Sequence, residues 1–530
     1  MAEDRGRAGT DEARRARRRA ESRHLLRASL VVSGLGVVSK GLGMLRESAV
    51  AAIFGAVRAM DAFLVALAIP TMFSTWIRMP IRAALVPLFT RHLHEEGEDR
   101  AWAVASNVIN TLAVALVLLV GVLWLAAPAL VRALSLGFRD EASWAEATRL
   151  ARILVVSIFF TVLAVVFGSL QNVYRRQHWP AIARVAQTGI VVAAILLLGP
   201  RIGLTGYALG ILAGAAASFL LQGTIVLAHL RHWRPVLRPL APEVREVAAL
   251  ALPLFIGLTG TRLDVILDRN FASFLPEGQL TMLWFAFAYS AVFTDLVVMV
   301  SQAVFLPHFA HLAAEGRTEE LRRRLGQALT AYLFLTLPVA AFLVAGAGPV
   351  VDLFLRWGKF TADNAALTAR LLAILALGSP FYLAGQLLAQ VFISRGDTKT
   401  PVKVGFWRIG FKALVSVALL PLLLVQGLAI ATTLSSWFRT GLLWRRLGRE
   451  VRPEAGPFLR RVALLVLSAA AGALAAAAFF AWGPIPGETV VPRAARLLAG
   501  AAITMTVHAG LAVATGAAPL GDLLARLRRR

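Results

Sequence analysis

A chain of 530 residues, 58% of them hydrophobic and only 16% charged, is far from a soluble domain, in which about 25% of residues are charged. The absence of cysteine excludes disulfide frameworks, thiolate zinc sites, iron–sulfur clusters and cysteine nucleophiles. The net charge of +25 comes from arginines that gather in short segments between apolar runs, which favours anionic membrane lipids as partners and argues against nucleic acid.

Apolar runs of about 20 residues, the length that crosses a bilayer core, recur along the whole chain. They predict an all-α integral membrane protein with about fourteen transmembrane helices. The predicted spans lie near residues 26–54, 59–90, 102–133, 147–173, 179–199, 203–230, 244–274, 279–312, 325–355, 365–394, 402–424, 426–444, 460–482 and 494–519. Residues 1–25 and 523–530 are predicted to be basic cytoplasmic tails.

An internal repeat divides these spans. Three pairs of residues stand 220 positions apart and end their spans in matching ways, namely Phe54 and Phe274, Pro87 and Pro307, and Phe89 and Phe309. A copy with an even number of spans re-enters the membrane in the same orientation, so this is a parallel repeat about an axis along the membrane normal. We expect a six-helix lobe over residues 26–231, a second over 242–447 and two extra transmembrane helices over 458–522, with a cavity between the lobes.

The basic loops alternate with the spans as a consistent topology requires. The segments 231–234, 322–324, 395–403 and 445–461 are rich in arginine and lysine, and all fall on one side of the membrane when the predicted spans are counted. By the positive-inside rule this side is cytoplasmic. Both termini are therefore expected in the cytoplasm.

Charged residues inside apolar spans cost about 2.5–3.5 kcal/mol each and should face a cavity or a partner. They concentrate in the first, second, seventh and eighth spans as Lys40, Arg46, Asp61, Arg78, Arg262, Asp264, Asp268 and Asp295. Because guanidinium groups bind phosphate oxygens bidentately and keep their charge, a cavity rimmed by them favours a phosphate-bearing ligand. The alternative is internal salt bridging, of Arg46 with Glu47 or Asp61, Arg262 with Asp264 or Asp268, and Arg78 with Asp295.

No Walker loop, dinucleotide fingerprint or Gly-x-Ser-x-Gly elbow occurs in the sequence. We therefore expect no cofactor and a secondary transporter, not an enzyme.

Short motifs along nearly the whole chain are similar to those of a known family. They are the segment Ser39 to Glu47, Phe54-Gly55-Ala56 with Asp61-Ala62-Phe63, the segment Leu170 to Ala181, Gly358-Lys359-Phe360-Thr361, and the segment Ser394 to Val402. In these segments the chain resembles the MurJ/MviN lipid II flippases of the multidrug/oligosaccharidyl-lipid/polysaccharide exporter superfamily.

The resemblance implies a cationic cavity that binds the pyrophosphate of an undecaprenyl-linked peptidoglycan precursor, lipid II. Alternating access in the bacterial inner membrane would then move the head group outward for cell wall synthesis. By matching position, Arg46 keeps a family arginine, Lys40 replaces another, and Asp61 keeps the acidic residue that opens the second span. Some family members couple transport to sodium or to the membrane potential. That makes Asp264 and Asp268 candidates for a cation site.

The sequence departs from the family within the predicted cavity. The family's paired arginines of the second span fall near Phe73 and Ser74, and its arginine of the eighth span aligns with Ala288. We expect Arg78 and Arg262 to replace them. For Asp295 both a cation site and a salt bridge stay open.

Four other functions compete with lipid II transport. They are a flippase for another lipid-linked oligosaccharide, a cation-coupled drug antiporter, a membrane glycosyl- or acyltransferase, and a non-transporting scaffold of the same fold. The intramembrane cations argue against the antiporter, which needs an acid-lined cavity. The transferase lacks an acidic or histidine-rich extracytoplasmic loop.

Overall fold

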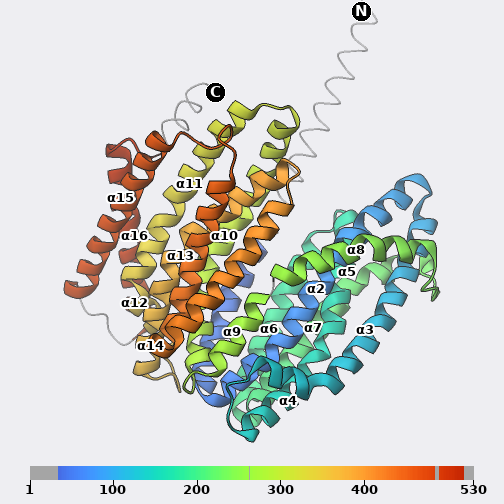
Figure 1. Cartoon of the computed structure of the whole chain (residues 1–530). Coiled ribbons are helices and arrows are strands. Elements are labelled where there is room, and N and C mark those ends of the chain that lie inside the picture. The colour runs from blue at the N-terminus through green and yellow to red at the C-terminus, as the bar shows by residue number, and fades with distance from the viewer. Residues whose placement is uncertain (1–33, 262, 484–488, 519–530) are drawn as a thin grey trace, which may run out of the picture. The chain divides into compact units, whose positions relative to one another are not determined.

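The computed structural model describes residues 34–261, 263–483 and 489–518 (Figure 1). Within these ranges the regular secondary structure is helical, and no strand occurs in them. Ten of the helices in this part of the chain are long and apolar enough to cross a membrane. The predicted all-α membrane fold is confirmed, whereas the count of fourteen spans is not.

One helix accounts for part of the lower count. Helix α14 (Lys399–Arg446) contains both of the predicted spans 402–424 and 426–444. At Leu424 the backbone leaves helical geometry, with φ of 49° and ψ of −131°, so two helices meet at a kink there. Residues with a side chain rarely adopt a positive φ, so Leu424 marks a locally strained break between the two helices.

The described helices pack into two compact units, neither of them continuous in sequence. The first unit comprises the chain up to Arg46, Ile69–Ala127 and Arg149–Ile256. The second comprises Glu47–Ala68, Pro128–Thr148 and the chain from Gly257 onward. The lobe bounds expected from the repeat, 26–231 and 242–447, stay a prediction.

The helices of the first half of the chain supply the first unit, apart from their segments Glu47–Ala68 and Pro128–Thr148, which belong to the second. Residues 34–54 form the first described helix. It is followed by α2 (Arg58–Glu95), α3 (Glu98–Leu134), α4 (Glu141–Val155), α5 (Ser157–Val173), α6 (His178–Ile202), α7 (Leu204–Ala228), the short 3-10 helix η1 (Leu230–His232) and α8 (Pro242–Thr261).

Close packing of α6 against α7 depends on glycines one turn apart. Gly206, Gly210 and Gly214 lie on one face of α7, as in the small-residue interfaces of membrane helices. A Cβ added at Gly210 would stand 2.5 Å from the Cβ of Ala194 on α6. Larger residues at these positions would therefore force the two helices apart.

The second unit contains the later helices. They are α9 (Leu263–Ser273), α10 (Gln279–Ala314), α11 (Thr318–Ala345), α12 (Ala347–Phe354), α13 (Ala362–Ser394), α14, α15 (Ala455–Trp482) and α16 (Val490–Ala514). Helix α13 packs against α10, α11 and α14. Helices α15 and α16 lie side by side, and both contact α11 (Figure 1).

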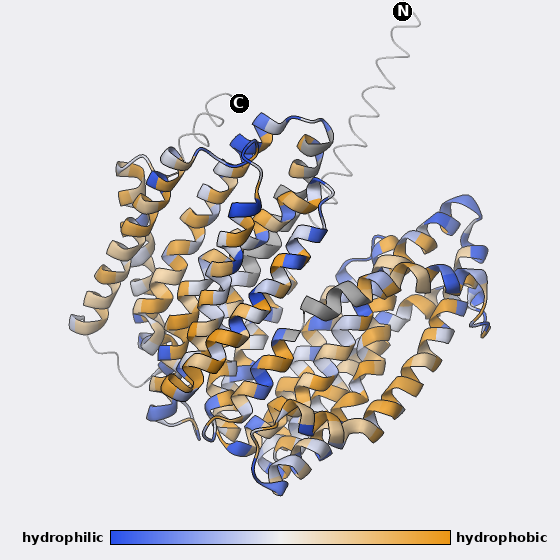
Figure 2. Cartoon of the chain, in the orientation of Figure 1, coloured by the Kyte–Doolittle hydropathy of each residue, from blue (hydrophilic) through white to orange (hydrophobic). Residues whose placement is uncertain are grey.

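Hydrophobic side chains cover the outward faces of many helices. Hydrophobic residues run along the helices, while many hydrophilic residues gather at helix ends and connecting loops (Figure 2). Leu118 on α3 is 66% exposed and Leu474 on α15 is 73% exposed. Such exposure is costly in water but favourable against lipid tails. The exposed apolar faces therefore fit a multi-pass membrane protein.

We expect Gly210→Ala to destabilise the α6–α7 contact by about 1–3 kcal/mol through overpacking. Gly189→Ala on α6 is the matched control, because a Cβ there meets nothing within 4 Å and alanine favours helix by up to about 1 kcal/mol. The thermal midpoint of purified protein should fall for the first variant and hold or rise for the second. Equal midpoints for both would contradict the packing argument.

Candidate functional site

Three of the cations expected in the cavity lie in the first unit. Lys40 and Arg46 lie on helix 34–54 and Arg78 lies on α2, and all three are half-buried. Long basic side chains in membrane helices can extend along apolar surface while their charges reach polar surroundings. Arg262 lies outside the described residues. Asp295 belongs to α10, but its side chain lies outside the described part of the structure.

Asp61 has a structural role in the second unit. It is 1% exposed, and its Oδ1 accepts hydrogen bonds from the backbone N–H of Thr281 at 2.9 Å and from the Thr281 hydroxyl at 2.7 Å. Its Oδ2 accepts from the backbone N–H of Gly278 at 2.7 Å. These donors surround the start of α10, where a carboxylate satisfies free N–H groups and the helix dipole. Asp61 therefore caps the start of α10, and its expected place in a substrate cavity stays a prediction.

A second carboxylate caps the start of α2. Glu277 Oε1 accepts a hydrogen bond from the backbone N–H of Arg58, the first residue of α2, at 2.9 Å. The 220-residue spacing of the repeat relates Asp61 to Thr281, and these two residues contact each other directly. Asp61 of the first repeat thus caps α10 in the second repeat, and Glu277 of the second repeat caps α2 in the first. The sequence motif singled out Asp61 but did not predict that it caps α10.

A glycine makes this contact possible. Gly278 has φ of +77°, and a Cβ added to it would stand 2.2 Å from the carbonyl oxygen of Ala56. A side chain at this position would be strained and would displace the segment it touches. The close approach places the N–H of Gly278 within reach of Asp61.

Further polar contacts connect the same segment to α10. Trp284 Nε1–H donates to Glu47 Oε2 at 3.2 Å, and the guanidinium of Arg269 lies 5.1 Å from the centre of the Trp284 ring. Glu47 and Arg269 are both buried. A guanidinium over an indole face is stabilised by the ring quadrupole. Trp284 therefore joins an acidic and a basic side chain that hydropathy alone placed in separate spans.

The two carboxylates of α9 contact cations from α14. Lys412 Nζ lies 2.7 Å from Oδ1 and 2.8 Å from Oδ2 of Asp268. Arg408 donates through its Nη2 to Oδ2 of Asp264. Asp264 and Asp268 thus lie one helical turn apart on α9. Their partners Arg408 and Lys412 likewise lie one turn apart on α14.

Arg408 and Lys412 were not singled out from the sequence, although a signal existed. Both are basic residues inside a predicted span, and their four-residue spacing equals that of the two α9 carboxylates. Residues four apart share a helix face, so two helices with matched spacing can form two ion pairs side by side. The pairing that the sequence suggested used Arg262 instead.

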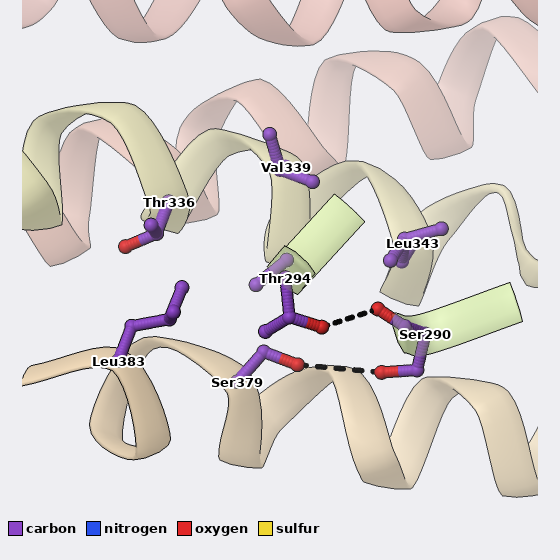
Figure 3. Close-up of a pocket in the computed structure, with 8 residues that line it drawn as sticks. Ser290, Thr294, Thr336, Val339, Leu343, Ser379 and Leu383 are labelled. Carbon is purple, nitrogen blue, oxygen red and sulfur yellow. Dashed lines mark hydrogen bonds between the residues drawn. The ribbon is translucent and has the colours of Figure 1, made fainter. Parts of the chain in front are cut away.

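The second unit also contains a small cavity of about 20 Å³ between α10, α11 and α13, lined by both hydroxyl-bearing and apolar side chains (Figure 3). Ser290 Oγ lies 3.4 Å from Ser379 Oγ, and the Thr294 hydroxyl donates to the Ser290 carbonyl at 2.7 Å. This volume suits about one water molecule. It is too small for a saccharide. Among the described residues, no group of His, Asp or Glu side chains is arranged to hold a metal ion.

Comparison with known proteins relates the chain to flippases. The family model "Lipid II flippase MurJ" matches residues 50–485. A probable lipid II flippase MurJ of Rhizobium meliloti is 28% identical, over 95% of this chain and 96% of that protein. The lipid II flippase MurJ of Burkholderia cenocepacia is 26% identical, over 84% of this chain and 88% of that protein.

Solved structures share the fold. A lipid II flippase MurJ in an inward closed conformation matches with a TM-score of 0.76 and 20% identity, over 92% of this chain and 99% of that one. An inward-facing multidrug resistance MATE family transporter matches with a TM-score of 0.59 and 16% identity, over 78% of this chain and 93% of that one. At these identities the likeness concerns the fold alone.

We expect Asp61→Asn to lower the free energy of unfolding by about 1–3 kcal/mol, because the amide replaces a buried charged acceptor by a weaker one and adds an unmatched donor. Asp140→Asn is the matched control, because Asp140 also caps a helix, accepting from the Ser143 N–H at 2.8 Å, but is exposed. Thermal unfolding of the two variants in detergent should separate them. Equal losses of stability would contradict the buried cap.

Proposed function

The chain belongs to the lipid II flippase MurJ family, and we propose on that basis that it moves a polyprenyl-pyrophosphate-linked saccharide, lipid II, across a bacterial cytoplasmic membrane. The observation that carries the proposal is the family match over residues 50–485. The all-helical fold with ten apolar helices among the described residues supports transport across a membrane. The motion proposed is alternating access.

The physical basis for cargo binding is the cationic side chains of the first unit. A pyrophosphate carries negative charge on several oxygens, and lysine and arginine in partly buried positions bind such groups through charge-assisted hydrogen bonds. Lys40, Arg46 and Arg78 are half-buried on helices that open the first unit. We propose that these three side chains hold the pyrophosphate, with Arg262 as a fourth.

The orientation proposed places both termini in the cytoplasm. Charge in the loops supports it, because the basic segments 231–234, 322–324, 395–403 and 445–461 would all face the cytoplasmic leaflet. Anionic lipids of that leaflet attract such segments by about 1 kcal/mol per basic residue near the surface. The same loops would thus fix topology and bind lipid headgroups.

Complementation tests the proposed function. The protein should restore growth to a bacterium depleted of its own lipid II flippase, scored with a probe that reacts with outward-facing lipid II. Arg46→Ala and Arg78→Ala should each reduce the rate of exposure by about tenfold or more, since a hydrogen bond to a charged group is worth about 1.5–3 kcal/mol. Arg184→Ala, at an exposed position of α6, should leave it unchanged.

Membrane abundance of each variant is measured alongside, so that loss of protein is not read as loss of transport. If the unmodified protein is abundant in the membrane but exposes no lipid II, the proposed function is wrong and a non-transporting scaffold is favoured. If Arg46→Ala and Arg78→Ala transport like Arg184→Ala, the proposed binding residues are wrong.

A further inference from the structure

The resemblance to the family made Asp264 and Asp268 on α9 candidates for a site that binds a coupling cation. A sodium ion is a hard cation, and hard cations are held by several oxygen ligands. The acidic side chains of α9 are Asp264 and Asp268. The groups of α14 that hydrogen-bond to their carboxylates are the nitrogens of Arg408 and Lys412. The buried Arg439, also on α14, interacts electrostatically with Asp264. Nitrogen donors with positive charge repel a metal cation instead of binding it.

The contact at Asp268 is the more complete of the two. The Lys412 ammonium lies within 2.8 Å of both carboxylate oxygens, which is where a cation bound to both oxygens would lie. Lys412 is 3% exposed, so its ammonium is not exchanging freely with solvent. At Asp264 one oxygen accepts from Arg408. The other, Oδ1, is buried and accepts no hydrogen bond from the described residues, which leaves one oxygen and not a ligand set.

We propose that Lys412 and Arg408 are tethered cations that take the places a coupling sodium ion would occupy on Asp268 and Asp264. These two carboxylates are then paired without a bound metal, and no sodium ion binds to them to drive transport. That sodium does not drive transport through these carboxylates rests on the proposed function. That sodium does not bind to them is independent of it.

Sodium-dependent stability is the direct test, because a ligand that binds only the folded state raises the midpoint of unfolding. The full-length protein is purified in detergent, and its thermal midpoint is compared in sodium chloride and in choline chloride at equal ionic strength. The unmodified protein should melt at the same temperature, within about 1 °C, in both salts.

Removing the tethered cation should create sodium dependence. In Lys412→Met the Asp268 carboxylate loses its ammonium, and sodium should raise the midpoint by several degrees in a saturable way, whereas choline should not. The double variant Lys412→Met, Asp268→Asn lacks the carboxylate that would bind sodium, so its midpoint should no longer depend on sodium. Arg395→Met, which breaks the exposed Arg395–Glu450 pair at 3.2 Å, is the matched control and should show none.

Arg408→Met carries the same expectation for Asp264 and supplies the measurement if Lys412→Met does not fold. A saturable stabilisation of the unmodified protein by sodium, abolished by Asp268→Asn, would overturn the proposal. Folded Lys412→Met and Arg408→Met proteins that both ignore sodium would also overturn it. Failure of complementation together with the expected salt behaviour would reject the proposed function and leave the tethered cations standing.

Discussion

The exchange of helix caps between the two repeats is the contact on which the second unit depends. Asp61 closes the start of α10 with three hydrogen bonds, and Glu277 closes the start of α2. Free N–H groups at a helix start are costly where water is scarce, so the cap by the buried Asp61 removes a penalty that lipid could not relieve. The contact requires Gly278, whose missing side chain lets the backbone of Ala56 approach. The segment 47–68 is thereby part of the second unit, although it precedes α10 by more than 200 positions.

Pairing of charge extends from that contact through the second unit. Arg269 lies over the Trp284 ring, whose N–H donates to Glu47, and α9 and α14 contribute two ion pairs. Single charges in a membrane helix are costly, and paired ones lose part of that cost. The pattern explains why ionisable residues are tolerated on these helices without an open cavity around each. On these helices Glu47, Asp264, Asp268 and Arg269 each have a partner within the protein.

Hydropathy predicted the all-α membrane class because chain length across a bilayer is a local property of the sequence. The sequence singled out Asp61 as a charged residue inside a span, yet its role as a cap depends on backbone N–H groups that carry no sequence signature. The ion pairs of Asp264 and Asp268 join residues 144 positions apart, so nearest-neighbour reasoning chose Arg262 instead of Arg408 and Lys412. By contrast, the predicted boundary between the spans 402–424 and 426–444 coincides with the kink at Leu424, although leucine itself gives no sign of a positive φ.

The distribution of charge also bears on what could drive transport under the proposed function. An inside-negative membrane potential is worth about 2.3 kcal/mol per charge per 100 mV and favours outward movement of anions. A pyrophosphate held by Lys40, Arg46 and Arg78 would be largely neutralised, so the loaded protein would move little net charge. The empty protein would return with its cations uncompensated, and the same potential favours that inward step. The membrane potential would therefore act mainly on the return of the empty protein. Since the α9 carboxylates are already paired with cations of α14, this return would not require a bound metal ion.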